Sequence, residues 1–86
     1  MAEKVSATEI IGKTIVSEEG GKKFGVVGNI EFAAETGELI NLILDQPTTY
    51  ATQLNLKKNS ENKFIIPFVA VKSIGDFVVI SESELL

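Results

Sequence analysis

The sequence contains no cysteine, no histidine and no arginine, so three chemically versatile side chains are missing. Without cysteine there is neither a disulfide nor a thiolate metal site, which fits a reducing compartment. Without histidine the chain lacks the commonest general base and the commonest metal ligand. Without arginine it lacks the bidentate fork that usually recognises phosphate and guanine. We therefore predict no enzymatic activity, no cofactor and no metal site.

Long hydrophobic runs and an excess of positive charge are also missing. No apolar run approaches the roughly 18 residues that a membrane helix needs, and no signal peptide is recognisable. We therefore expect a cytoplasmic protein that does not insert into a membrane. The net charge of −4 and the pI of about 4.7 have the wrong sign for a general nucleic-acid binder. We expect no DNA ligand, and RNA binding is disfavoured.

The 86 residues that are present suffice for one small domain. We place its core at about residues 5–80, followed by a short tail at 81–86. Hydrophobic residues make up 44% of the chain and the mean hydropathy is +0.21, which is high for a soluble monomer of this size. These values suggest that a partner completes part of the apolar surface.

Short strands dominate the pattern, and no window has a sustained helical period. Strands are predicted near residues 14–16, 24–32, 39–45, 64–66 and 77–80. Single helical turns are predicted at 7–11, where Ser6 and Glu9 fit a capping box, and at 68–70. Residues 46–62 are expected to form a long connection, with a brief strand or turn near 54–56. The reversals and bends are assigned to Gly12, Gly25, Gly28, Gly37, Pro67 and the hairpin pair Gly75 and Asp76. The predicted fold is therefore mainly β, a small barrel of five to six strongly bent antiparallel strands with one or two single-turn helices.

Alternation assigns the side chains to two faces of the predicted sheet. In the longest strand Phe24, Val26, Ile30 and Phe32 are predicted to face the core, with Val27, Asn29 and Glu31 opposite. In the stretch "ETGELINLILD" the core residues are predicted to be Ile40, Leu42 and Leu44, with Leu39 and Ile43 opposite. This second face is not cleanly polar, so it is covered either by the chain itself or by a partner. The candidate interface residues are Val27, Leu39, Asn41, Ile43 and Tyr50.

The order of these motifs resembles the PRC-barrel domain family. "VSATEIIGKTIVSEEGGKKFGVVGNIEF" is similar to the opening of such domains, "ETGELINLIL" to their hairpin and third strand, and "IIPFVAVKSIGDFVVI" to their closing segment. The resemblance runs from about Val5 to Ile80. Residues 46–62 fall in a part that varies within the family, so nothing is carried over to them.

The resemblance implies a non-catalytic interaction module. The closing segment is most similar to stand-alone archaeal members implicated in cell division. These members resemble adaptors that form homodimers, or heterodimers with a paralogue, and contact SepF, the membrane anchor of the FtsZ ring. Recruitment to the division site would then pass through that partner. Two alternatives remain: a module like that of RimM, which binds a ribosomal protein or RNA during ribosome assembly, and a barrel that binds a small ligand.

Other patterns are better explained by ordinary surface chemistry. The acidic pairs Glu18-Glu19 and Glu82/Glu84 lack the apolar pocket that would separate two carboxyl pKa values for catalysis. The letters "GVVG" at residues 25–28 fit the loop of a KH domain, yet they lie within a strand pattern. The lysine pairs at 22–23 and 57–58 are typical of solubilising charges on an acidic protein.

Overall fold

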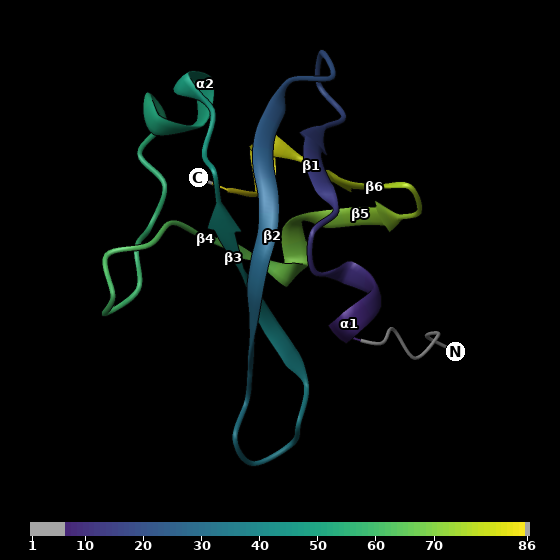
Figure 1. The fold of residues 1–86 in the computed structure, drawn as a ribbon, viewed down its shortest axis with the longest axis vertical. Coiled ribbons are helices and arrows are strands. Elements are labelled where there is room, and N and C mark those ends of the chain that lie inside the picture. The colour runs from purple at the N-terminus through teal and green to yellow at the C-terminus, as the bar shows by residue number, and fades with distance from the viewer. Residues whose placement is uncertain (1–6, 86) are drawn as a thin grey trace.

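The computed structural model describes residues 7–85, which form one six-stranded sheet with short helices around it (Figure 1). The strand order is β4-β3-β2-β1-β6-β5. The elements along the chain are α1 (Ala7–Ile10), β1 (Thr14–Ser17), β2 (Lys23–Phe32), β3 (Leu39–Asp45), α2 (Thr49–Thr52), β4 (Ile65–Pro67), the 3-10 turn η1 (Phe68–Ala70), β5 (Val71–Ile74), β6 (Phe77–Ile80) and the 3-10 turn η2 (Glu82–Glu84). Within residues 7–85, no helix has both the length and the apolar character needed to cross a membrane.

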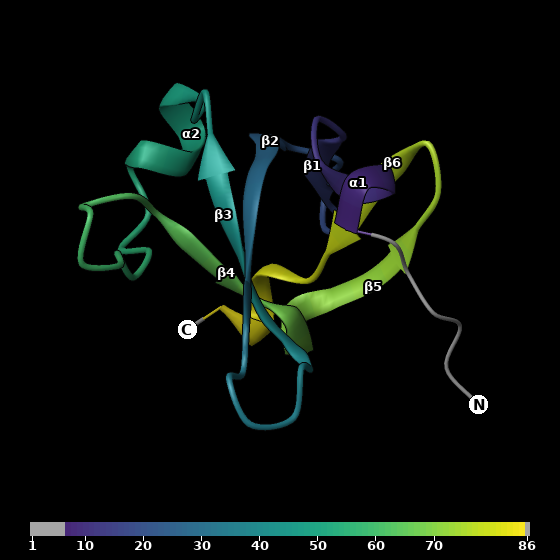
Figure 2. The ribbon, with the colours of Figure 1, turned by 60° about the horizontal axis from the view of Figure 1, so that its bottom comes forward.

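The predicted mainly β fold is confirmed, with two differences from the expected barrel. The sheet is not closed, because β4 and β5 occupy its two ends and η1 joins them without strand pairing. Figure 2 shows the sheet curled so that these end strands approach each other near η1. In addition, β1 and β6 run parallel, while the other neighbouring strands are antiparallel. The β5–β6 hairpin lies on the far side of β1 from β2, with β6 next to β1.

Four register shifts curl the sheet, since one strand of a pair has an extra residue at each of them. The extra residues are Phe24 and Gly28 in β2, Ile40 in β3 and Lys72 in β5. Each such bulge bends its strand and increases the local twist. The sequence predicted a bend around Gly25 and Gly28, but gave no signal for the bulges at Ile40 and Lys72.

Gly25 and Gly28 are required by the close approach of β3. The backbone at Gly25 has φ +147°, and a Cβ there would lie 2.6 Å from the carbonyl oxygen of Asp45. A Cβ on Gly28 would lie 2.7 Å from the Cβ of Asp45. Any larger residue would therefore push β2 and β3 apart at the point where the sheet curls.

The core lies inside the curl and receives side chains from all parts of the chain. The largest fully buried apolar residues are Ile10, Ile15, Phe24, Val27, Leu42, Ile66, Val78 and Ile80. Partly buried residues, including Leu39, Val71 and Ile74, pack against this cluster. Burial of this set removes apolar surface from water, and each Å² removed stabilises the folded state by about 25 cal/mol. This hydrophobic contribution drives the folding of the domain.

The bulges also explain which face assignments were wrong. Val27 is 1% exposed and lies in the core rather than on the outer face, because the bulge at Gly28 brings Val27 and Ile30 to the same side. Phe32 and Ile40 were predicted to face the core, yet they are 49% and 46% exposed. Ile40 is the extra residue of a bulge, so Leu39 takes its place against the core.

Ile43 also differs from its predicted exposure, for another reason. It is buried although it does not belong to the main core cluster. With Glu61 and Lys63 it lines a small cavity, and it is paired with Asn29 and Ile65 on the neighbouring strands. The chain itself therefore covers the second face of β3 at this position.

The connection at 46–62 is more ordered than its composition indicated. It contains α2, whose first turn is capped by the Thr48 hydroxyl accepting from the amide of Ala51 at 3.2 Å. The same hydroxyl donates to the carbonyl of Lys23 at 2.7 Å, which fixes the helix to the start of β2. Ala51 and Leu56 are buried in the core. This segment therefore contributes to the core and is not a separate surface loop.

Residues 81–85 also belong to the folded domain, although a tail was predicted. Ser81 is buried and its amide donates to the carbonyl of Ala70 at 2.8 Å. Leu85 packs against the core. The proposed capping role of Ser6 lies outside the described residues.

We expect Gly25→Ala to lower the free energy of unfolding by roughly 1 to 3 kcal/mol, because the new methyl group meets the backbone of Asp45 at a positive φ. Gly75→Ala is the matched control, since nothing lies within 4 Å of its Cβ position. Urea denaturation of both variants measures the effect. Equal stability of the two variants would contradict the close-approach argument.

We expect Leu42→Ala to cost about 2 to 5 kcal/mol of stability, because a fully buried side chain leaves a cavity when it is shortened. Ile40→Ala, two residues earlier on the same strand, should cost far less because Ile40 is the exposed residue of a bulge. Denaturation midpoints of the two variants test the register. The reverse order of costs would show that the bulge is misplaced.

Candidate interaction surfaces

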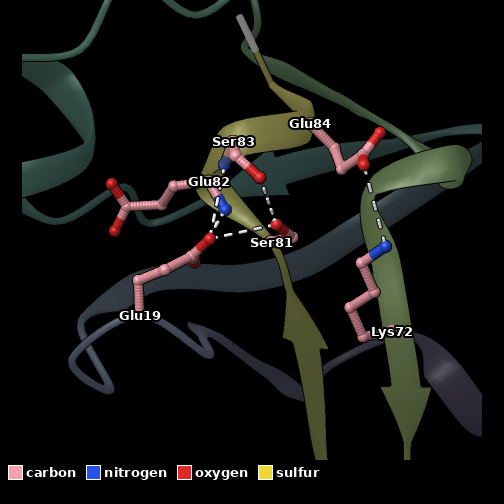
Figure 3. A network of polar contacts seen from close by, with 6 residues as sticks. All are labelled: Glu19, Lys72, Ser81, Glu82, Ser83 and Glu84. Atoms are coloured by element: carbon pink, nitrogen blue, oxygen red, sulfur yellow. Dashed lines mark hydrogen bonds and ion pairs between the residues drawn. The ribbon is translucent and has the colours of Figure 1, made fainter.

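A network of polar contacts centred on Glu19 fastens the end of the chain to the β1–β2 turn (Figure 3). The Glu19 carboxylate accepts hydrogen bonds from the amide of Glu82 at 2.9 Å and from the hydroxyl of Ser81 at 3.0 Å. Ser81 and Ser83 share a further contact between their hydroxyl oxygens at 2.9 Å. Lys72 of β5 lies 3.9 Å from Glu84. Glu19 of the pair Glu18-Glu19 and both residues of the pair Glu82/Glu84 therefore take part in contacts within the fold. Their spacing in the sequence did not reveal this role.

The hydrogen bond from the amide of Glu82 lowers the pKa of Glu19 below its ordinary value of 4.5. Hydrogen bonds to a carboxylate favour its charged form, and here they outweigh the opposing effect of desolvation. A lowered pKa means that the charged group stabilises the fold above its unfolded-state pKa. That stabilisation is lost as the pH falls through the lower pKa of the folded state.

Tyr50, one of the predicted interface residues, is engaged within the domain. Its hydroxyl donates to the carboxylate of Glu82 at 2.7 Å, and this hydrogen bond is the main reason why the pKa of Tyr50 is raised above 10.0. Its ring meets Phe24 edge to face at a centroid distance of 5.7 Å, and the ammonium group of Lys22 lies 5.2 Å from the ring centre. Tyr50 is half-buried and makes contacts within the domain with Glu82, Phe24 and Lys22.

The predicted interface residues do not form one surface. Val27 and Ile43 are buried, so their assignment to an exposed face is wrong. Leu39, Asn41 and Tyr50 are half-buried. Asn41 borders a groove, and the interface role of all three remains a prediction.

The exposed large apolar side chains lie elsewhere, and the first group of them marks the β2–β3 hairpin. Phe32 and Ile40 come from the arm of this hairpin, and Val69, which is 74% exposed, comes from η1. The turn η1 contacts β3, and the preceding Pro67 is paired with Asn41 at the base of the arm. Figure 1 shows the arm extending beyond the rest of the sheet. We call Phe32, Ile40 and Val69, with the carboxylates of the arm, the hairpin surface.

A second group of exposed apolar side chains lies where β1 and β6 begin. Phe77 is 50% exposed and Ile11 is 45% exposed. Thr14 pairs with Phe77, and the ammonium group of Lys13 donates to the carbonyl of Gly75, so these two segments are held together. We call Ile11 and Phe77 the β1–β6 end.

A groove of about 340 Å³ opens beside the base of the hairpin arm. Its apolar walls come from Leu56, Ile65, Pro67 and Leu85. The polar residues Asn41, Lys57 and Glu84 lie at its border. No close group of three acidic, histidine or cysteine side chains that could hold a metal ion occurs within residues 7–85.

Both end strands of the open sheet are shielded against addition of another strand. At the outer edge of β4, the amide of Ile65 already donates to the carbonyl of Lys57 at 2.9 Å, and Pro67 offers no amide hydrogen. On β5 the bulge at Lys72 interrupts the edge with a charged residue. Bulges, lysine and proline are the usual means by which proteins prevent edge-to-edge pairing. Association through side chains is therefore favoured over strand pairing.

The curled sheet, the single-turn helices and the exposed apolar ends define a small β domain of the barrel type. The PRC-barrel domain family matches residues 2–86, and the chain belongs to this family. No curated protein matches the chain closely enough to add a named relative.

We expect Glu19→Gln to be less stable than the native sequence near pH 7, with a difference that shrinks as the pH falls below about 4.5. The reason is that the hydrogen bonds to the Glu19 carboxylate stabilise the fold most while Glu19 is charged. Denaturation midpoints from pH 7 to pH 3 measure this dependence. Glu18→Gln, the exposed neighbour, is the control, and an identical pH profile for both variants would contradict the role of the Glu19 network.

Proposed function

We propose that this PRC-barrel domain is a non-catalytic protein-interaction module that acts as a dimeric adaptor in archaeal cell division. The observation that carries the proposal is the presence of two exposed apolar surfaces on a chain without histidine, cysteine or arginine. Exposed apolar patches on small domains are typical of sites where other proteins bind. Two separate surfaces suit an adaptor, which needs one for its own copy and one for a partner.

The β1–β6 end is the better candidate for the dimer contact. A two-fold contact brings the same patch of both copies together, so charges can pair across it only where the patch contains both signs. Around Ile11 and Phe77 both signs of charge are present, as Lys13 and Asp76. Residues of opposite sign can then pair across the two-fold axis. The shielded edges of β4 and β5 favour this side-chain contact over pairing of strands.

The division role and its partner rest on the resemblance of the closing segment to stand-alone archaeal members of the family. In this proposal the dimer contacts SepF, which brings it from the cytoplasm to the FtsZ ring at the membrane. A ribosome-assembly role like that of RimM is the main alternative. The acidic net charge of −4 supports a protein partner over RNA.

We expect Phe77→Ser to shift the protein from dimer to monomer, because it removes the largest exposed apolar group of the β1–β6 end. Phe32→Ser is the matched control, since Phe32 is the same residue at 49% exposure on the other surface. Sedimentation velocity at micromolar concentrations measures the state of each. A native protein that sediments as a 9.3 kDa monomer would refute the dimer.

The partner is tested separately by capture with purified SepF and with purified ribosomal subunits. Binding to SepF that survives washing, without binding to ribosomal subunits, is the expected result. Binding to ribosomal subunits alone would replace the division role by the assembly role.

A further inference from the structure

The excess negative charge of the chain is concentrated in the segment that contains the hairpin. Residues 24–56 hold four acidic side chains, Glu31, Glu35, Glu38 and Asp45, and no lysine. The rest of the chain has eight acidic and eight basic residues and is neutral. The net charge of −4 is therefore the charge of this segment alone. Three of its four carboxylates belong to the arm and its turn, next to the exposed side chains of Phe32 and Ile40.

One carboxylate of the arm is held in place and connects the hairpin to the groove. The side-chain amide of Asn41 donates to Glu31 at 3.0 Å across the paired strands. Asn41 also lines the groove whose walls are formed by Leu56, Ile65, Pro67 and Leu85. Asn41 therefore lies both at the border of the apolar groove and beside a carboxylate of the hairpin arm.

We propose that the hairpin surface and the groove together bind an extended protein segment in which apolar side chains are flanked by lysine or arginine. This inference rests on the proposed adaptor function and specifies the chemistry of its partner. The apolar side chains of the segment occupy the groove and cover Phe32 and Ile40. Its cationic groups face Glu31, Glu35 and Glu38, which offers complementary charge at the rim of an apolar contact.

Charge also argues against other occupants of this surface. In a two-fold contact between hairpins, the carboxylates of one copy would face those of the other with no lysine among them, and like charges brought together oppose association. Phosphates of a nucleic acid or an anionic membrane would meet the same repulsion. A basic, apolar protein segment is the occupant that the surface complements.

Two synthetic peptides of equal length test the proposal by fluorescence anisotropy: one alternates leucine with lysine and the other leucine with glutamate. We expect the basic peptide to bind at least about tenfold more tightly to the native protein. The triple variant Glu31→Lys, Glu35→Lys, Glu38→Lys should weaken the binding of the basic peptide by about tenfold or more. The matched control, Glu9→Lys, Glu18→Lys, Glu61→Lys, makes the same change in net charge at exposed sites outside the arm and should weaken it by less than about threefold.

Equal losses in both triple variants would overturn the proposal, because the peptide would then be sensing only the overall charge. Binding that is unchanged in Phe32→Ser would also overturn it, since the apolar contact would be absent. Circular dichroism of each variant verifies that it is folded. Loss of the dimer in the hairpin triple variant would identify a second copy as the occupant instead.

The outcome is independent of the tests of the proposed function. If Phe77→Ser leaves the association state unchanged, or if SepF does not bind, the adaptor role fails while peptide binding at the hairpin still stands. If the peptide does not distinguish the two triple variants, the hairpin proposal fails while the dimer contact at the β1–β6 end is unaffected.

Discussion

The close packing of β3 against the two glycines of β2 is the constraint on which the rest of this structure depends. Asp45 lies so near to Gly25 and Gly28 that neither position has room for a Cβ. This approach, with the bulges at Phe24 and Gly28, bends the longest strand of the sheet. The bend allows Val27, Ile30 and Leu42 to meet side chains from β6 and α1 in one core. A flat sheet of the same strands would leave that face in water.

The curl of the sheet has two consequences, one for the edges of the sheet and one for the β2–β3 hairpin. The sheet stays open, so its edges are shielded locally by Pro67, by the bulge at Lys72 and by the segment that pairs with β4. The arm of the hairpin extends beyond the rest of the sheet (Figure 1), and its side chains Phe32 and Ile40 are 49% and 46% exposed. The same bending that builds the core therefore produces the exposed apolar surface that the proposed function uses.

Polar contacts at the end of the chain complete the domain where apolar burial is sparse. Glu19 holds the amide of Glu82 and the hydroxyl of Ser81, and Glu82 in turn accepts from Tyr50. These bonds hold the segment that places Leu85 against the core, where its side chain forms one wall of the groove. A segment that lacks its own hydrophobic periodicity thus becomes part of both the fold and the candidate binding surface.

The sequence by itself determined the mainly β class, the positions of the main strands and turns, and the family, because these follow from local alternation, glycine and proline chemistry and the order of short motifs. Tertiary structure decided which side chains are buried. The bulges at Gly28 and Ile40 exchange faces that alternation had assigned. The glycines of β2 indicated a bend, but which residues change face is set by the packing of β3 against them. The helix α2 and the Glu19 network depend on contacts between residues far apart in the chain, such as Thr48 with Lys23 and Glu19 with Glu82. The exposed surfaces were misplaced for the same reason, since exposure depends on which neighbours the curled sheet brings over each residue.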